Sequence, residues 1–173
     1  MSERVTGDLV TERLLLHRLT VAEAEELVAG GGGGRRAPGY PTDGDVSAAR
    51  RFLRACAEDG AGRHPGAFEI RRLDDGCAIG GAEFHGPADE AGTVTIGYGL
   101  APSARGSGYA SEALRALLAY ARERGFRRVR GDADHDNVAS QRVMAAAGMR
   151  PAGADERVRY YETAWDGPVG AGC

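Results

Sequence analysis

The sequence has 173 residues, enough for one domain that buries about 70% of the surface exposed by its unfolded chain. Its 42% hydrophobic and 27% charged residues are ordinary for a globular protein, and a net charge of −3 argues against a nucleic-acid-binding surface. All 22 basic residues are arginine, which excludes Schiff-base catalysis by lysine and the phosphate-binding lysine of a Walker motif.

No apolar run reaches 18 residues, and the N-terminal segment lacks the apolar core of a signal peptide. We therefore expect a cytoplasmic protein without a membrane segment. The three cysteines, Cys56, Cys77 and Cys173, match no zinc or redox spacing, and an odd number of scattered thiols suits a reducing compartment. The four histidines are equally dispersed, so we expect no metal site.

In chain order, residues 14–19 form the first expected strand, and Thr20 begins a helix because Glu23 follows it at capping-box spacing. A run of five glycines follows, so residues 30–44 are expected to be a loop, either a connector or a lid over a substrate cleft. Asp45 is expected to begin a second helix, whose apolar stripe consists of Ala49, Phe52, Leu53 and Cys56.

Three strands are expected next, at 67–73, 77–85 and 93–100. Short segments containing glycine and aspartate separate them, which favours an antiparallel meander. The rest of the chain is expected to form a helix that ends at Gly125, a strand at 126–133, a helix from Val138 to Ala147 and a strand at 157–165. A meander followed by a β-α-β crossover predicts an α/β (α+β) fold, a mixed sheet with helices on both faces.

Residues 104–114, ARGSGYASEAL, combine small residues and an arginine directly before a helix. Gly106 and Gly108 allow main-chain N–H groups to turn toward one point, which the N-terminus of the helix also faces. Arg105 adds a positive charge, so the segment suits a pyrophosphate, with a plain glycine-rich connection as the alternative. The third glycine of the dinucleotide fingerprint is missing, and a Walker motif needs a lysine.

These residues resemble the GNAT N-acetyltransferase superfamily. Its acetyl-CoA motif is Q/R-x-x-G-x-G/A, and RGSGYA at 105–110 matches it at every position. GYGLAP before this motif is similar to the family's strand that pairs with pantetheine, and NVASQRVMAAAGM at 137–149 is similar to its second CoA-contacting helix. TERLLLHRLT near the start, together with Ser140, resembles the branch of ribosomal-protein N-terminal and small-amine acetyltransferases. The resemblance covers about residues 10–165.

The resemblance implies one acyltransferase domain at 1–166, and we expect a flexible tail at 167–173. It implies a mostly antiparallel sheet of six to seven strands, splayed at the acyl-CoA site, with acetyl-CoA as co-substrate and no metal. The main chain of Leu100 and Ala101 would pair with the pantetheine amides, and Asn137 would hydrogen-bond the pantetheine arm. The pyrophosphate would be held by the backbone amides of Arg105, Gly106, Ser107, Gly108, Tyr109 and Ala110.

Acetyl transfer needs a neutral amine, a hydrogen-bond donor to the carbonyl oxygen of the thioester, and a proton for the departing thiolate. In many family members a tyrosine seven residues after the asparagine supplies that proton, but Met144 occupies this position here. Ser140 is the replacement that the resemblance implies, close to the CoA thiol, either as a proton donor or as a hydrogen-bonding partner of the sulfur. A small residue chosen for packing is the alternative.

Glu83 is a candidate general base, because a carboxylate inside the apolar strand GGAEFHG is expected to be partly buried and to have a raised pKa. A solvent-facing position on that strand is the alternative. His85 lies two residues further along, on the same face of the strand. Together with Tyr40 and Tyr98 it is expected to contact the acceptor. Asp134 and His135, at the end of the strand before the second CoA helix, are a further candidate pair for the general base, and several carboxylates and a water molecule are expected to share that role.

We therefore expect an acetyl-CoA-dependent N-acetyltransferase that acts on a primary amine of a small molecule or a peptide N-terminus. The amine would attack directly in a ternary complex, without a cysteine acyl-enzyme. One alternative is a succinyl- or propionyl-CoA donor, for which Arg35 or Arg36 supplies a basic residue. Others are a non-catalytic CoA-binding regulatory domain and an unrelated phosphate-binding module. Neither nucleic acid nor membrane is an expected partner, and a homodimer stays open.

Overall fold

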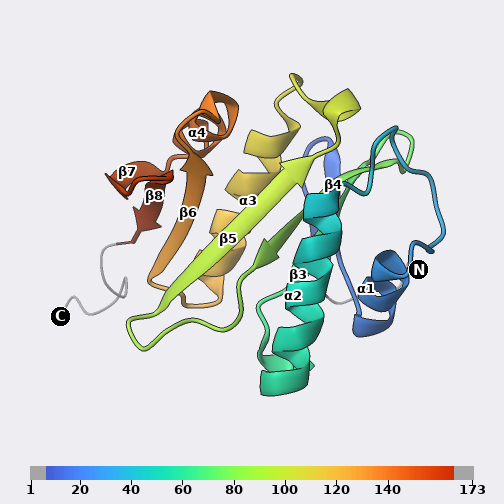
Figure 1. Cartoon of the computed structure of the whole chain (residues 1–173), viewed down its shortest axis with the longest axis horizontal. Coiled ribbons are helices and arrows are strands. Elements are labelled where there is room, and N and C mark those ends of the chain that lie inside the picture. Colours follow the sequence, from blue (N-terminus) through green and yellow to red (C-terminus); the bar gives the residue numbers. More distant parts are fainter. Residues whose placement is uncertain (1–6, 166–173) are drawn as a thin grey trace.

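The computed structural model of the chain describes residues 7–165. They form one eight-stranded sheet in the order β1-β2-β3-β4-β5-β6-β8-β7 (Figure 1). Neighbouring strands are antiparallel except for the parallel pair β5–β6. The strands are β1 (Leu9–Val10), β2 (Leu14–Arg18), β3 (Ala67–Arg72), β4 (Ala78–Phe84), β5 (Thr93–Leu100), β6 (Arg128–Asp134), β7 (Arg150–Ala154) and β8 (Val158–Ala164).

Helices cover both faces of this sheet, as the sequence predicts. Helices α1 and α2 pack against each other, and α2 lies across β3, β4 and β5, whereas α3 lies behind the sheet (Figure 1). Helix α4 packs against α3 and against the β6–β8 end. The bounds are α1 (Val21–Val28), α2 (Asp43–Asp59), α3 (Tyr109–Glu123) and α4 (Val138–Ala146), with short 3-10 turns at Ala61–Arg63 and Pro102–Ala104.

The second helix begins earlier than predicted. Thr42, not Asp45, is its N-cap: the Thr42 hydroxyl accepts from the Asp45 N–H, and the Asp45 carboxylate accepts in return from the Thr42 N–H. This reciprocal pair is a capping box, which satisfies two main-chain donors that a helix end leaves unpaired. The interpretation of Asp45 as the first capping residue is therefore wrong by three positions.

Two strands were not predicted from the sequence. β1 has only two residues, and all five residues of β7 are exposed and include Pro151 and Gly153, so neither shows alternating apolar residues. Both lie at edges of the sheet, where a strand needs only one pairing partner. The predicted tail at 167–173 lies outside the described residues.

The sheet is splayed between β5 and β6. The two strands pair only from Thr93 with Arg128 to Thr95 with Arg130. Beyond Thr95 they diverge: the end of β6 points toward α4, and the end of β5 points toward the loop before α3 (Figure 1). The predicted splay is thus present, and it leaves one edge of β5 without a strand neighbour from residue 96 to residue 100.

Candidate functional site

The glycine-rich turn before α3 presents a row of main-chain N–H groups. Gly108 is the N-cap of α3 in the left-handed conformation (φ +81°), and no side chain caps the helix. Gly106 also has positive φ (+89°), and a Cβ there would meet nothing within 4 Å. Among the described residues, the N–H groups of 106–110 have no acceptor, whereas that of Arg105 donates to the Pro102 carbonyl (3.4 Å). Five of the six predicted phosphate-binding amides are therefore available.

Arg13 lies beside this turn, although the sequence analysis did not single it out. Its guanidinium donates to the Ser107 carbonyl (2.9 Å) and to Glu112 in the first turn of α3 (2.7 Å), and it stacks over the Tyr109 ring at 4.5 Å. Glu112 thus has a structural role as the ion-pair partner of Arg13, and the Arg105 side chain is directed to the Leu100 carbonyl at the end of β5.

The splay exposes main-chain groups of β5. Ala101 donates to the Ile79 carbonyl (2.8 Å), and its own carbonyl accepts from the N–H three residues on (2.9 Å). Neither group of Ala101 is therefore free for pantetheine. Because hydrogen-bonding direction alternates along a strand, the main-chain groups of Tyr98 and Leu100 point into the splay. The Leu100 carbonyl accepts from Arg105 Nε (3.3 Å).

A pair of hydroxyl groups connects β5 to α4 across the splay. Tyr98 Oη lies 2.9 Å from Ser140 Oγ, and the phenol also donates to the Ser140 carbonyl (3.2 Å). Asn137 is the N-cap of α4, where its Oδ1 accepts from the Ser140 N–H (3.1 Å). Met144 is fully buried, and its sulfur would lie 3.0 Å from a Cβ at Gly131. Position 144 is thus a core position, and the hydroxyls near this part of α4 come from Ser140 and Tyr98.

Glu83 occupies the opposite face of the sheet, under α2. It is 2% exposed, and its Oε1 accepts two hydrogen bonds from Arg51, one from Nε at 2.8 Å and one from Nη2. His85 Nε2 lies 3.5 Å from the same oxygen. Oε2 has no hydrogen-bond partner. Burial raises the pKa of Glu83 to about 7, although the hydrogen bond and charge of Arg51 act in the opposite direction.

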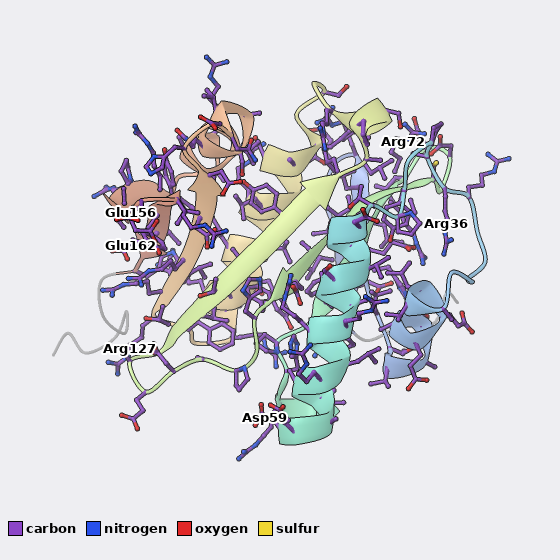
Figure 2. All side chains as sticks on the ribbon, in the orientation of Figure 1. Arg36, Asp59, Arg72, Arg127, Glu156 and Glu162 are labelled. Carbon is purple, nitrogen blue, oxygen red and sulfur yellow. The ribbon has the colours of Figure 1, made fainter. Side chains whose placement is uncertain are left out.

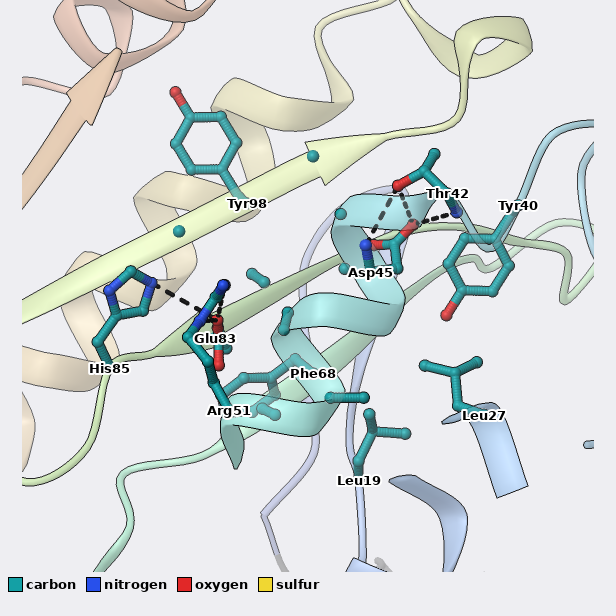
Figure 3. A pocket seen from close by; sticks show the side chains of 18 residues that line it. Leu19, Leu27, Tyr40, Thr42, Asp45, Arg51, Phe68, Glu83, His85 and Tyr98 are labelled. Atoms are coloured by element: carbon teal, nitrogen blue, oxygen red, sulfur yellow. Dashed lines mark hydrogen bonds and ion pairs between the residues drawn. The ribbon is translucent and has the colours of Figure 1, made fainter. Parts of the chain in front are cut away.

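Glu83 faces a cavity of about 250 Å³ between α2 and the sheet. Glycines form its floor: a Cβ at Gly81 would lie 2.8 Å from Asp45 Oδ1, one at Gly97 would lie 3.0 Å from His85 Nε2, and one at Gly99 would meet nothing within 4 Å. The missing side chains at Gly81 and Gly97 therefore leave room for Asp45 and His85, and the one missing at Gly99 leaves open space. Figure 3 shows Glu83, Arg51 and His85 toward one end and Leu19, Leu27 and Tyr40 toward the other.

The structure brings the predicted acceptor residues to this cavity in different ways. Tyr40 and His85 both line it together with Glu83. The Tyr40 hydroxyl donates a hydrogen bond to Glu69 (2.8 Å), so the ring, not the hydroxyl, is free to contact an acceptor substrate. Tyr98 also lines the cavity, but its hydroxyl points away from Glu83 toward Ser140 (Figure 3). Arg51, which pairs with Glu83, was not predicted.

Arg36, one of the two basic residues considered for a longer acyl donor, has its guanidinium directed to the loop before α2. Its guanidinium donates to the Gly31 carbonyl (2.8 Å) and lies over the Tyr40 ring. Figure 2 places it at the end of the molecule opposite to Glu156 and Glu162 of the β7–β8 region. It therefore does not support a carboxylated acyl group between β5 and β6.

Two further findings concern residues 7–165 only. No group of three histidine, cysteine, aspartate or glutamate side chains is arranged to hold a metal ion in this range. Within the same range, every helix is too short or too polar to cross a bilayer.

A family model described as an acetyltransferase (GNAT) domain matches residues 13–150, most of the chain. The chain belongs to the GNAT acetyltransferase family. This membership agrees with the turn before α3, the splay between β5 and β6 and the mostly antiparallel sheet.

Relatives of this GNAT chain are found among curated proteins and solved structures. The "Uncharacterized N-acetyltransferase YnaD" of Bacillus subtilis is 36% identical over 87 residues, which are 50% of this chain and 51% of that protein, so the match spans about half of each. The ribosomal-protein-S5-alanine acetyltransferase of Vibrio fischeri superimposes with a TM-score of 0.67 at 14% identity, covering 92% of this chain and 97% of that one. Mycobacterium smegmatis RimJ in complex with CoA-disulfide superimposes with a TM-score of 0.61 at 22% identity, covering 87% and 81%. At these identities the two structures show a shared fold.

Proposed function

We propose that the protein is an acetyl-CoA-dependent N-acetyltransferase whose acceptor is a primary amine. The observation that carries the proposal is Glu83, a carboxylate at the wall of a cavity, with one oxygen fixed by Arg51 and the other buried without a hydrogen-bond partner. A buried polar atom without a partner is costly, which points to a ligand group that completes its hydrogen bonding. An amine supplies that group.

The residues before α3 fit the diphosphate of coenzyme A. Five free N–H groups lie at the positive end of the α3 dipole, and the Arg13 guanidinium is bound to the Ser107 carbonyl of the same turn. The free edge of β5 at Tyr98 and Leu100 would pair with the pantetheine amides and lead the thioester toward the splay. Known complexes of a structural neighbour with CoA support this assignment.

Acetyl-CoA supplies an activated acyl group, and the protein must supply proton transfers. An alkylammonium with a pKa of about 10.4 has to lose a proton before nitrogen can attack. Glu83 Oε2 would accept that proton, and its pKa of about 7 is suited to a base that works near neutral pH. The new bond forms between nitrogen and the acyl carbon, and the carbon–sulfur bond breaks.

The departing thiolate would take a proton from Ser140, whose hydroxyl Tyr98 fixes, and the second proton that the nitrogen loses as it becomes an amide would restore the Ser140 hydroxyl. Neither of the two cysteines within residues 7–165 lines the cavity, which favours attack on the acyl carbon by the acceptor nitrogen over attack by a cysteine thiol. Cys56 and Cys77 are located elsewhere, on α2 and directly before β4. Direct transfer in a ternary complex is therefore the mechanism that these residues support.

The test is a thiol-release assay with acetyl-CoA and a panel of primary amines. Wild type should release CoA in the presence of amine, and Glu83→Gln should reduce kcat by about a hundredfold or more. Glu58→Gln, which changes an exposed glutamate on α2, is the matched control and should leave the rate unchanged. CoA binding without thiol release for every amine would contradict the proposal and favour a regulatory CoA-binding domain.

A further inference from the structure

We infer that the acceptor is a small diamine, a primary amine with a second ammonium group a few methylenes away, whose second cation binds Asp45. This inference rests on the proposed function, because the same cavity and the same base are used.

Asp45 is a buried carboxylate without a cationic partner. It is 9% exposed, and no arginine or histidine forms an ion pair with it among the described residues. Its Oδ2 accepts from the N–H and the hydroxyl of Thr42, both at 2.8 Å. Buried charges in proteins are normally paired, so this one lacks what most buried carboxylates have.

The second oxygen of Asp45 is directed at the cavity floor. Oδ1 makes no hydrogen bond among residues 7–165, and it lies so close to Gly81 that a Cβ there would be only 2.8 Å away. Asp45 and Gly81 both line the cavity. The capping box explains Oδ2 but leaves Oδ1 free.

Glu83 lines the same cavity and has a second, independent unpartnered oxygen. Its side chain is almost fully buried, and Oε2 has no hydrogen-bond partner among the described residues. Figure 3 shows Glu83 toward one end of the cavity and Asp45 toward the other, near Tyr40. Two free carboxylate oxygens in one small cavity define two cation-binding points.

The surfaces between these two points suit a methylene chain. Ala49 of α2 and Ala67 of β3 line the cavity and are buried, and Gly81 and Gly99 leave the backbone bare beneath it. The one guanidinium in the lining, that of Arg51, is bound to Glu83 Oε1. Among the described residues, the lining therefore has no unpaired guanidinium for the carboxylate of an amino acid, which would also lie near Asp45.

The experiment compares 1,4-diaminobutane with pentylamine, in which a methyl group replaces the second ammonium. Wild type should favour the diamine by about ten- to a hundredfold in kcat/KM, which is the range for a charged hydrogen bond. Asp45→Asn keeps an oxygen for the capping box and should lose this preference, because KM for the diamine should rise far more than KM for pentylamine. Asp43→Asn is the matched control, because Asp43 lies in the same first turn of α2 but is exposed and does not line the cavity.

Equal rates for the two amines in wild type would overturn the inference. An equal loss of kcat/KM for both amines in Asp45→Asn would also overturn it, since that result assigns Asp45 to helix capping alone. The same loss of diamine preference in Asp43→Asn would overturn it as well. Calorimetric binding of the diamine to the CoA-bound protein separates this inference from the proposed function. Asp45-dependent binding without thiol release would contradict the function only, whereas thiol release with any amine but no Asp45 dependence would contradict the inference only.

Discussion

Tyr98 Oη on β5 lies 2.9 Å from Ser140 Oγ on α4, so one hydrogen bond connects the strand and the helix on the two sides of the splay. Burial raises the pKa of Tyr98, although the hydrogen bond with Ser140 acts in the opposite direction, so the phenol remains a donor at neutral pH. When Tyr98 donates to Ser140 Oγ, the serine proton is free to point toward a sulfur atom. The pair therefore places a donor at the position where a thiolate would leave.

Tyr98→Phe should lower kcat by about tenfold, and Ser140→Ala should lower it by about a hundredfold, because general acid catalysis contributes factors of this size. Thiol-release assays give kcat, and calorimetry gives the affinity for CoA. This affinity should not change in either variant. Tyr161→Phe on β8 is a control for loss of a tyrosine hydroxyl outside the cavity. Unchanged kcat in Ser140→Ala would limit Ser140 to a packing role.

Glu83→Gln should make the protein inactive but more stable at alkaline pH. The folded pKa of Glu83 is about 7, above its reference value of 4.5. Its contribution to the free energy of unfolding is therefore fully present below about pH 4.5 and is lost as pH rises through about 7. The total loss is on the order of 3 kcal/mol. The variant should melt at higher temperature than wild type at pH 8.

Thermal unfolding across pH checks this expectation, since the difference between the two proteins should disappear near pH 4. A variant that is less stable than wild type at pH 8 would show that Glu83 holds the fold together. It would then count as a structural ion-pair partner of Arg51 instead of a strained functional group.

Gly106→Trp should weaken CoA binding by more than tenfold, because the side chain would occupy the space that the free amides face. Gly125→Trp is a close match: its φ is +88° against +89° for Gly106, and neither Cβ would meet an atom within 4 Å. Both variants carry the same backbone strain, but Gly125 follows the other end of α3. Equal CoA affinity of the two variants, measured by calorimetry, would rule out the turn before α3 as the diphosphate site.

The sequence predicts the central elements and the turn before α3 because both depend on local chemistry. Apolar spacing marks α3, and the glycines at 106 and 108 are needed for positive φ. β1 and β7 could not be predicted, since edge strands with exposed residues carry no alternating pattern. Their pairing depends on neighbours that are distant in the sequence.

The sequence predicted several residues of the candidate site, but it did not predict the side chains that these residues contact. Glu83 stands out in the sequence as a charge in an apolar strand, but Arg51 looks like any exposed helix residue. Only the placement of α2 over β4 brings their side chains together. In the same way, Ser140 was predicted from a motif, while its hydrogen bond with Tyr98 depends on how far β5 and β6 diverge.

Arg51→Met should move the pH dependence of kcat/KM to higher pH. The hydrogen bond and charge of Arg51 lower the pKa of Glu83 against the larger effect of burial, so their removal raises that pKa above about 7. A base must be unprotonated to work, so the acidic limb of the profile should shift up by about one pH unit or more. With one amine throughout, activity at pH 7 should fall and should recover near pH 9. Arg54→Met, three residues further along α2 and exposed, should leave the limb in place. An unshifted limb in Arg51→Met would assign the titration to another group, because Glu83 is the carboxylate that Arg51 contacts.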